Sequence, residues 1–114
     1  KVFFYDSGLM QMLWLKALPQ EILGTVFETA VFAEFVKTRG SKDLFFWRTQ
    51  GKQEIDFILR KPDGLVPYEV KLRFEQWNRS SMKYFCDRYG IEECYCVGLE
   101  GDVSARERIF PWQI

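Results

Sequence analysis

The sequence predicts an α/β domain in which a mixed central sheet is flanked by helices in three layers. Two stretches of alternating apolar residues meet across a turn-forming tetrapeptide, as the strands of a hairpin do. Helical stretches precede and follow this hairpin, and further strand-like stretches complete the order αβββαβ. In chain order, the elements are expected at 20–39 (helix), 44–48, 53–60 and 65–72 (strands), 80–89 (helix) and 93–97 (strand).

Two helices of different character are expected to cover the sheet. The helix at 20–39 is apolar around most of its circumference, which predicts burial on more than one side. Gly40 is its natural stop. The second helix is expected to be capped by Ser80 or Ser81 and to end at Gly90.

Further elements are expected at both ends of this core. VFFY at 2–5 predicts a short strand, and Asp6 or Ser7 is placed to cap a brief helix through about Leu15. The tail, RIFPWQI, predicts an edge strand that stops at Pro111.

The apolar faces of the two hairpin strands predict the hairpin's register. A slip of one residue would turn the apolar face of one strand away from the core, so the two faces must match. A bulge at Gly64 would shift this register by one residue. The expected pairs are Leu59 with Val66, Phe57 with Tyr68 and Ile55 with Val70.

The same register places charged residues opposite one another. Asp56 is expected opposite Glu69, and Glu54 opposite Lys71. Two facing carboxylates are destabilising unless something compensates, and a divalent cation is the obvious candidate. The alternative is an ordinary half-solvated strand, in which Glu54 and Lys71 form a surface ion pair worth under ~1 kcal/mol.

Composition limits the classes of protein to be considered. The 114 residues are 47% hydrophobic, which predicts one globular domain over 1–114. No apolar run approaches the roughly 20 residues of a membrane span, so no membrane association is expected. The odd number of cysteines, 3, without a CxxC pair favours a reducing, cytoplasmic setting. Because the chain opens on Lys1, with no Met and no signal-like segment, we expect it to be a piece of a longer polypeptide.

The chain contains no histidine, which excludes several kinds of site within it. Ser-His-Asp and Cys-His catalysis, histidine-based nucleases and Cys/His zinc sites all need that residue. Any chemistry must therefore use carboxylates, lysine, hydroxyls or thiols. The net charge of +0 provides no overall attraction to nucleic acid.

Three weaker features each allow two interpretations. Trp47 and Arg48 could stack on bases, or Trp47 could belong to the core. Cys94 and Cys96 are expected on one side of a strand as small buried side chains. A run of basic residues could bind phosphates, or simply form a solvated face. The basic residues are Lys71, Arg73, Arg79, Lys83 and Arg88.

Two patterns in the sequence resemble known families. Asp56 followed after a dozen residues by Glu69-Val70-Lys71 resembles the PD-(D/E)XK nuclease superfamily, which has the restriction-endonuclease-like fold. The segments KVFFYDSGL, GTVFETAVFAEF, LFFWRTQGKQEIDFIL and VPYEVK, in this order, resemble the C-terminal domain of unknown function that follows AAA+-type ATPase modules in bacteria and archaea. That resemblance spans nearly the whole chain and implies an ATPase module upstream of Lys1, where ATP would bind.

The superfamily resemblance implies roles for five residues. Asp56 and Glu69 would hold magnesium or manganese through carboxylate oxygens, helped by the carbonyl of Val70. Lys71 would orient the attacking water or offset charge on the phosphate. Glu28 matches a helical acid that many members direct at the same site, or it is merely paired with an arginine.

The resemblance leaves two hypotheses about function. The first is a magnesium-dependent nuclease domain attached to an ATPase, although Ile55 stands where the PD motif has its proline. The second is a catalytically silent domain that binds nucleic acid or protein, or regulates the ATPase. The expected partners are a nucleic acid, with DNA favoured, the upstream ATPase module and, in a homo-oligomer, further copies of the chain.

Overall fold

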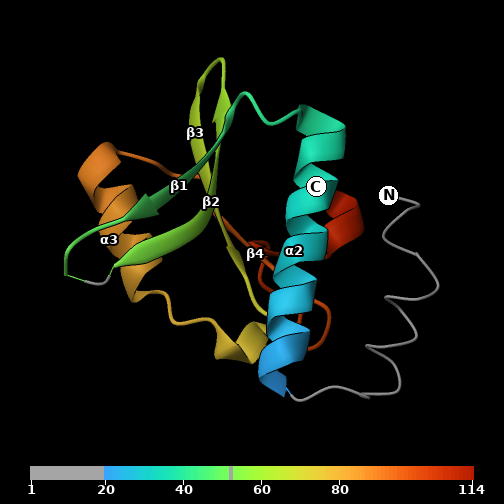
Figure 1. Cartoon of the computed structure of the whole chain (residues 1–114). Helices are drawn as coiled ribbons and strands as arrows, with labels where there is room; N and C mark the ends of the chain where they lie inside the picture. Colours follow the sequence, from blue (N-terminus) through green and yellow to red (C-terminus); the bar gives the residue numbers. More distant parts are fainter. Residues whose placement is uncertain (1–19, 52) are drawn as a thin grey trace.

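The computed structural model describes residues 20–51 and 53–114 (Figure 1). The expected strand at 2–5 and the expected helix through Leu15 lie outside these residues. The described elements are α2 (Gln20–Arg39), β1 (Leu44–Arg48), β2 (Glu54–Lys61), β3 (Gly64–Val70), α3 (Ser80–Tyr89), β4 (Tyr95–Val97) and β5 (Arg108–Ile109), with short 3-10 helices at Phe74–Gln76 and Pro111–Gln113.

The five strands form one mixed sheet in the order β1-β2-β3-β4-β5. β1, β2 and β3 are antiparallel neighbours, whereas β3, β4 and β5 run parallel to one another. Figure 1 shows α2 and α3 on opposite sides of this sheet. The predicted α/β class, the mixed sheet flanked by helices and the order αβββαβ are therefore confirmed.

Each helix packs on its own apolar cluster. Phe27, Val31 and Phe35, spaced four residues apart on α2, are fully buried against the β2–β3 hairpin. On the other face, Met82 and Phe85 of α3 pack into a second cluster. The core therefore lies in two layers on either side of the sheet.

The helix ends follow local chemistry, with one correction. Gly40 has a φ of 79° and Gly90 a φ of 66°, so that glycine ends both helices as predicted. The expected capping of α3 by Ser80 or Ser81 is wrong. Arg79 occupies the N-cap position without a side-chain cap bond, and the Asn78 side chain instead accepts a hydrogen bond from the Ser80 N–H at 3.0 Å.

The register of the hairpin is as predicted near the turn. Phe57 pairs with Tyr68 and Leu59 with Val66, so Gly64 does not shift the pairing. Pro67 is tolerated inside the sheet because β4 pairs with β3 only from Tyr68 onward.

Further from the turn, a β-bulge in β2 changes the predicted arrangement. Phe45 pairs with Ile58 but Trp47 pairs with Ile55, so Phe46 faces two residues of β2 instead of one. The extra residue sends Ile55 to the cluster on the α3 side. The prediction that Ile55 shares a face with Phe57 was therefore wrong.

The carboxyl-terminal tail adds the predicted edge strand. β5 pairs in parallel with β4 and stops before Pro111. β4 is shorter than expected, because it begins at Tyr95 and leaves Cys94 before the strand. Within the described residues, none of the helices combines the length and apolarity needed to cross a membrane.

Candidate functional site

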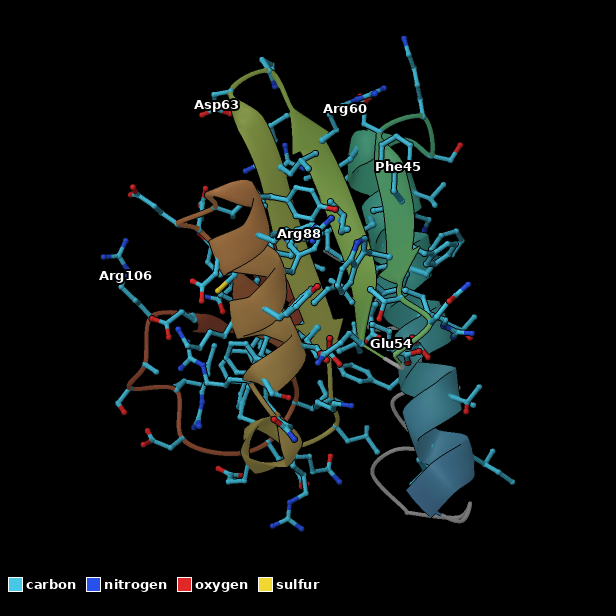
Figure 2. The ribbon with its side chains drawn as sticks, turned by 90° about the vertical axis from the view of Figure 1, so that its left-hand side faces the viewer. Phe45, Glu54, Arg60, Asp63, Arg88 and Arg106 are labelled. Carbon is cyan, nitrogen blue, oxygen red and sulfur yellow. The ribbon has the colours of Figure 1, made fainter. Side chains whose placement is uncertain are left out.

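A cavity of about 390 Å³ opens where β2 and β3 separate. It lies beside the amino-terminal half of α2, at the end of the hairpin away from the turn. Figure 2 shows Glu54 at this end of the sheet and Asp63 of the turn at the other. The cavity is lined by Gly24, Thr25, Glu28, Glu54, Asp56, Val70, Lys71, Leu72 and Gln76.

Asp56 lies in the β-bulge, and its side chain accepts a hydrogen bond from the backbone of β3. Its Oδ2 atom accepts a hydrogen bond from the Val70 N–H at 2.8 Å. The predicted register places Val70 opposite Ile55, so the Val70 N–H was expected to bond to the backbone of β2. It bonds instead to the side chain of Asp56. Bulges commonly redirect a side chain in this way. The bulge therefore brings the Asp56 carboxylate to the cavity and fixes it to the end of β3.

Glu69 is nearly enclosed beside Asp56. Its side chain is 13% exposed, and its Oε2 atom lies 3.6 Å from Nζ of Lys71. Burial, followed by the neighbouring Asp56 charge, raises the pKa of Glu69 to about 8 against the opposing effect of Lys71. The carboxylate of Asp56 therefore disfavours ionisation of Glu69. This is the repulsion between facing acids that the sequence predicts.

Glu28 reaches the same place from α2. Its side chain lines the cavity, and burial raises its pKa, followed by the charge of Asp56 and a side-chain hydrogen bond with Asp56. Lys71 acts in the opposite direction. The structure thus brings Glu28 to Asp56, and none of the ion pairs described for residues 20–51 and 53–114 joins Glu28 to an arginine.

Lys71 is held by the neighbouring strand. Its backbone N–H donates to the Val97 carbonyl at 3.0 Å, which extends the parallel pairing of β3 with β4 by one residue. Its side chain lines the cavity and remains partly exposed. Lys71 is thus positioned by the sheet while its ammonium group can still reach a ligand.

The expected pairing of Glu54 with Lys71 is wrong. Glu54 instead forms an ion pair with Arg48, in which Nε and Oε2 are 3.0 Å apart. The reason is the bulge: beyond it Glu54 pairs with Arg48 of β1, whereas the pairing of β2 with β3 ends at Phe57 and Tyr68. Glu54 still lines the cavity as a third acid beside Glu28 and Asp56.

The donor chemistry of this cluster fits a hard cation. Carboxylate oxygens and a backbone carbonyl are the ligands that magnesium prefers. The pKa values of Glu28 and Glu69 are raised, so a bound cation would stabilise the ionised form of both side chains. In the part of the chain that the structure describes, however, no group of three or more Cys, Asp or Glu residues is arranged as a metal site.

The weaker features of the sequence are largely structural. Trp47 packs on Phe85, with ring centroids 5.0 Å apart, and so belongs to the layer between sheet and α3. Cys96 is buried, as expected. The basic run is partly neutralised, because three of its members pair with acids: Lys71 with Glu69, Arg79 with Glu107 and Lys83 with Asp87.

Sequence reasoning missed several residues that line the cavity. Gly24 and Thr25 lie one helical turn before Glu28, so the GTVFE segment itself carried a signal for them. Gln76 arrives through the 3-10 turn Phe74–Gln76, where its Oε1 accepts the Arg73 N–H at 3.1 Å. No periodic pattern in the sequence indicates that turn.

Fold and cavity together define a three-layer α/β domain with a group of carboxylates and a lysine at the point where two strands separate. The chain belongs to the family DUF4143, described as a domain of unknown function, whose model matches residues 23–114. No curated protein and no solved structure matches the sequence significantly. The resemblance to a domain of unknown function is therefore confirmed at the level of the family.

Proposed function

We propose that this domain is a magnesium-dependent nuclease of the PD-(D/E)XK type, with the restriction-endonuclease-like fold, attached to an AAA+-type ATPase module. The observation that supports it is the meeting of Glu28, Asp56 and Lys71, from three separate segments, in one cavity beside Glu69. The pattern Asp56 … Glu69-Val70-Lys71 spans the two strands that separate there. A manganese ion would serve in place of magnesium.

In this proposal the residues of the cavity divide the work of phosphodiester hydrolysis. Asp56 and Glu69, with the Val70 carbonyl, would hold the cation, which supplies charge neutralisation and an activated water when bound. Lys71 would place its ammonium group against the negative charge that builds up on the phosphate. Glu28, whose pKa is raised by burial and by Asp56, is suited to hold a proton at the rim of the site.

A second candidate is a catalytically silent domain that binds nucleic acid or protein, or regulates the ATPase. A specific observation favours it: two of the proposed site residues already have partners inside the chain. Asp56 accepts the Val70 N–H, and Lys71 pairs with Glu69. Net charge +0 also provides no electrostatic attraction to a phosphate backbone. The three free cysteines suit the cytoplasmic setting that we propose in either case.

The test is cleavage by the full-length polypeptide with ATP and magnesium on single-stranded, duplex and branched DNA and on RNA. We expect wild type to cut at least one of these and Asp56→Asn to cut none. Asp87→Asn is the matched control, because Asp87 lies in an exposed pair with Lys83 on α3. The silent domain would be favoured if Asp56→Asn cut at the wild-type rate, or if none of the proteins cut any substrate.

Calorimetric titration with manganese separates the cation site from catalysis. Wild type and Asp87→Asn are expected to bind, and Asp56→Asn is not. Equal binding by all three proteins would place the cation elsewhere.

A further inference from the structure

A second surface, built from aromatic rings, adjoins the cavity. Phe46 on β1 is 72% exposed and Phe32 on α2 is 37% exposed. Their ring centroids are 6.4 Å apart and their planes differ by 21°. Both rings also rest on the buried ring of Phe57, at 5.8 and 5.9 Å. The two rings are therefore held by Phe57 and present an exposed apolar area, which we call the Phe32–Phe46 surface.

The Phe32–Phe46 surface continues from the cavity. Phe32 follows Glu28 by four residues and so lies one turn further along the same side of α2. Phe46 is the β1 residue that faces the bulge formed by Asp56 and Phe57. Both rings thus neighbour residues of the proposed catalytic site, Phe32 along α2 and Phe46 across the bulge, although neither ring lines the cavity itself.

A basic side chain lies on the same side of β1. Arg48 is two residues beyond Phe46 and therefore shares its strand face, and its side chain is 76% exposed. Its ion pair with Glu54 is exposed on both sides and contributes little to stability. The guanidinium group can therefore turn from Glu54 towards a phosphate that approaches the surface.

We propose that the Phe32–Phe46 surface stacks the bases of a single-stranded nucleic acid whose backbone enters the cavity. The inference rests on the proposed function and names its substrate class: a single strand, or a single-stranded extension, and not a continuous duplex. Aromatic side chains stack on any unpaired base, whereas the bases of a duplex already stack on one another. Because the chain has a net charge of +0, stacking must supply affinity that a basic groove would otherwise give.

The test measures binding of a labelled oligothymidylate and of a duplex of the same length, without divalent cations, to the full-length protein. Wild type is expected to prefer the single strand. Phe46→Ala is expected to weaken single-strand binding by about 5- to 100-fold, and the fold should survive because most of the Phe46 side chain is exposed. Tyr89→Ala is the matched control, since that ring is also exposed but lies on α3, and we expect no change.

A spectroscopic readout distinguishes stacking from loss of structure. Phe46→Trp is expected to keep the affinity and to add tryptophan fluorescence that the oligothymidylate quenches. Equal binding of duplex and single strand, or unchanged binding by Phe46→Ala, would overturn the inference even if the nuclease assay succeeds. A change in oligomeric state on Phe46→Ala, without a change in binding, would overturn it in favour of contact with a second copy of the chain. Single-strand binding that needs Phe46, in a protein that cuts nothing, would support this surface while refuting the proposed nuclease.

Discussion

The Asp56 carboxylate accepts the Val70 N–H at 2.8 Å, and this contact joins the β-bulge of β2 to the end of β3. Asp56 therefore has a structural role whether or not it holds a cation. Val70 is buried apart from the cavity that it lines, so removal of the acceptor leaves its N–H without this protein partner. The two strands meet at this point through a side chain, and the stability of the cavity depends on it.

Replacing Asp56 separates its acceptor role from its charge. Asp56→Ala leaves the buried Val70 N–H without an acceptor, which is expected to lower the free energy of unfolding by about 1–3 kcal/mol. Asp56→Asn retains an oxygen acceptor for the Val70 N–H, so we expect it to be more stable than Asp56→Ala. Urea unfolding of both variants is the measurement, and equal stabilities would contradict the structural role.

Stability without a cation is expected to fall as the pH rises. Burial, together with the Asp56 charge, raises the pKa of Glu69 from its ordinary value of 4.5 to about 8. Between these values the folded state binds more protons than the unfolded state, so stability is complete below about pH 4.5 and is lost as the pH rises through about 8. A loss of the order of 5 kcal/mol is expected across this window, since each pKa unit corresponds to about 1.36 kcal/mol.

The urea midpoint at several pH values measures this effect. Glu69→Gln is the informative variant, because it keeps the shape of the side chain and cannot ionise. Its midpoint is expected to change less with pH than that of wild type. A wild-type midpoint that rises from pH 5 to pH 9 would show that Glu69 is ionised in the folded protein.

Magnesium is expected to reverse that loss. A cation binds the ionised carboxyl groups and competes with their protons. Saturating magnesium, at about 100 times its dissociation constant, would then stabilise the fold by about 2.7 kcal/mol. The gain should be larger near about pH 9 than near about pH 6, and Glu69→Gln should reduce it. Thermal unfolding with and without magnesium checks this, and a gain that is independent of pH would place the cation away from Glu69.

Gly98 is expected to control the position of Lys71. A Cβ atom at this residue would lie 2.8 Å from the Phe74 ring and 3.0 Å from the Lys71 carbonyl oxygen. Gly98→Ala must therefore displace the segment that carries Lys71 or the ring beneath it, at an expected cost of about 1–3 kcal/mol. Gly24→Ala is the control, since no atom lies within 4 Å of its added Cβ. Urea unfolding should separate the two variants clearly.

The elements of the fold could be predicted from the sequence because their signals are local. The alternation of apolar residues and the turn at Lys61–Gly64 determine the hairpin near its tip, and Gly40 and Gly90 end their helices through their own backbone freedom. The bulge could not be predicted in this way. It depends on how β1 aligns with β2, and neither strand alone carries a pattern for that alignment.

The same distinction holds for the candidate site. Asp56 and Glu69 could be named because they stand on adjacent strands, and Lys71 through the family resemblance. The partner of Glu54 was missed because the bulge turns it towards Arg48. Glu28 was named only through a family resemblance, since its approach to Asp56 depends on how α2 packs on the sheet. Local pattern therefore located the acids, and tertiary packing decided which of them meet.

Lys71 separates a nuclease from a silent domain. If its ammonium group faces the negative charge that builds up on a phosphate, Lys71→Ala should lower the cleavage rate by about 10²–10³. The fold should survive, because the Lys71 backbone N–H still donates to Val97. Lys83→Ala removes the same charge from the exposed pair on α3 and is expected to leave cleavage unchanged.

The loss of Lys71 could also act indirectly, by releasing Glu69 from its ion pair. Glu54→Gln tests the influence of a nearby charge, since Glu54 lines the cavity but pairs with Arg48, and it should retain much of the activity. Manganese affinity measured on Lys71→Ala supplies the second readout. Retained affinity with lost cleavage assigns Lys71 to the chemical step, because the cation would still be in place. Unchanged cleavage by Lys71→Ala would remove it from the mechanism and leave the carboxylates as a binding site alone.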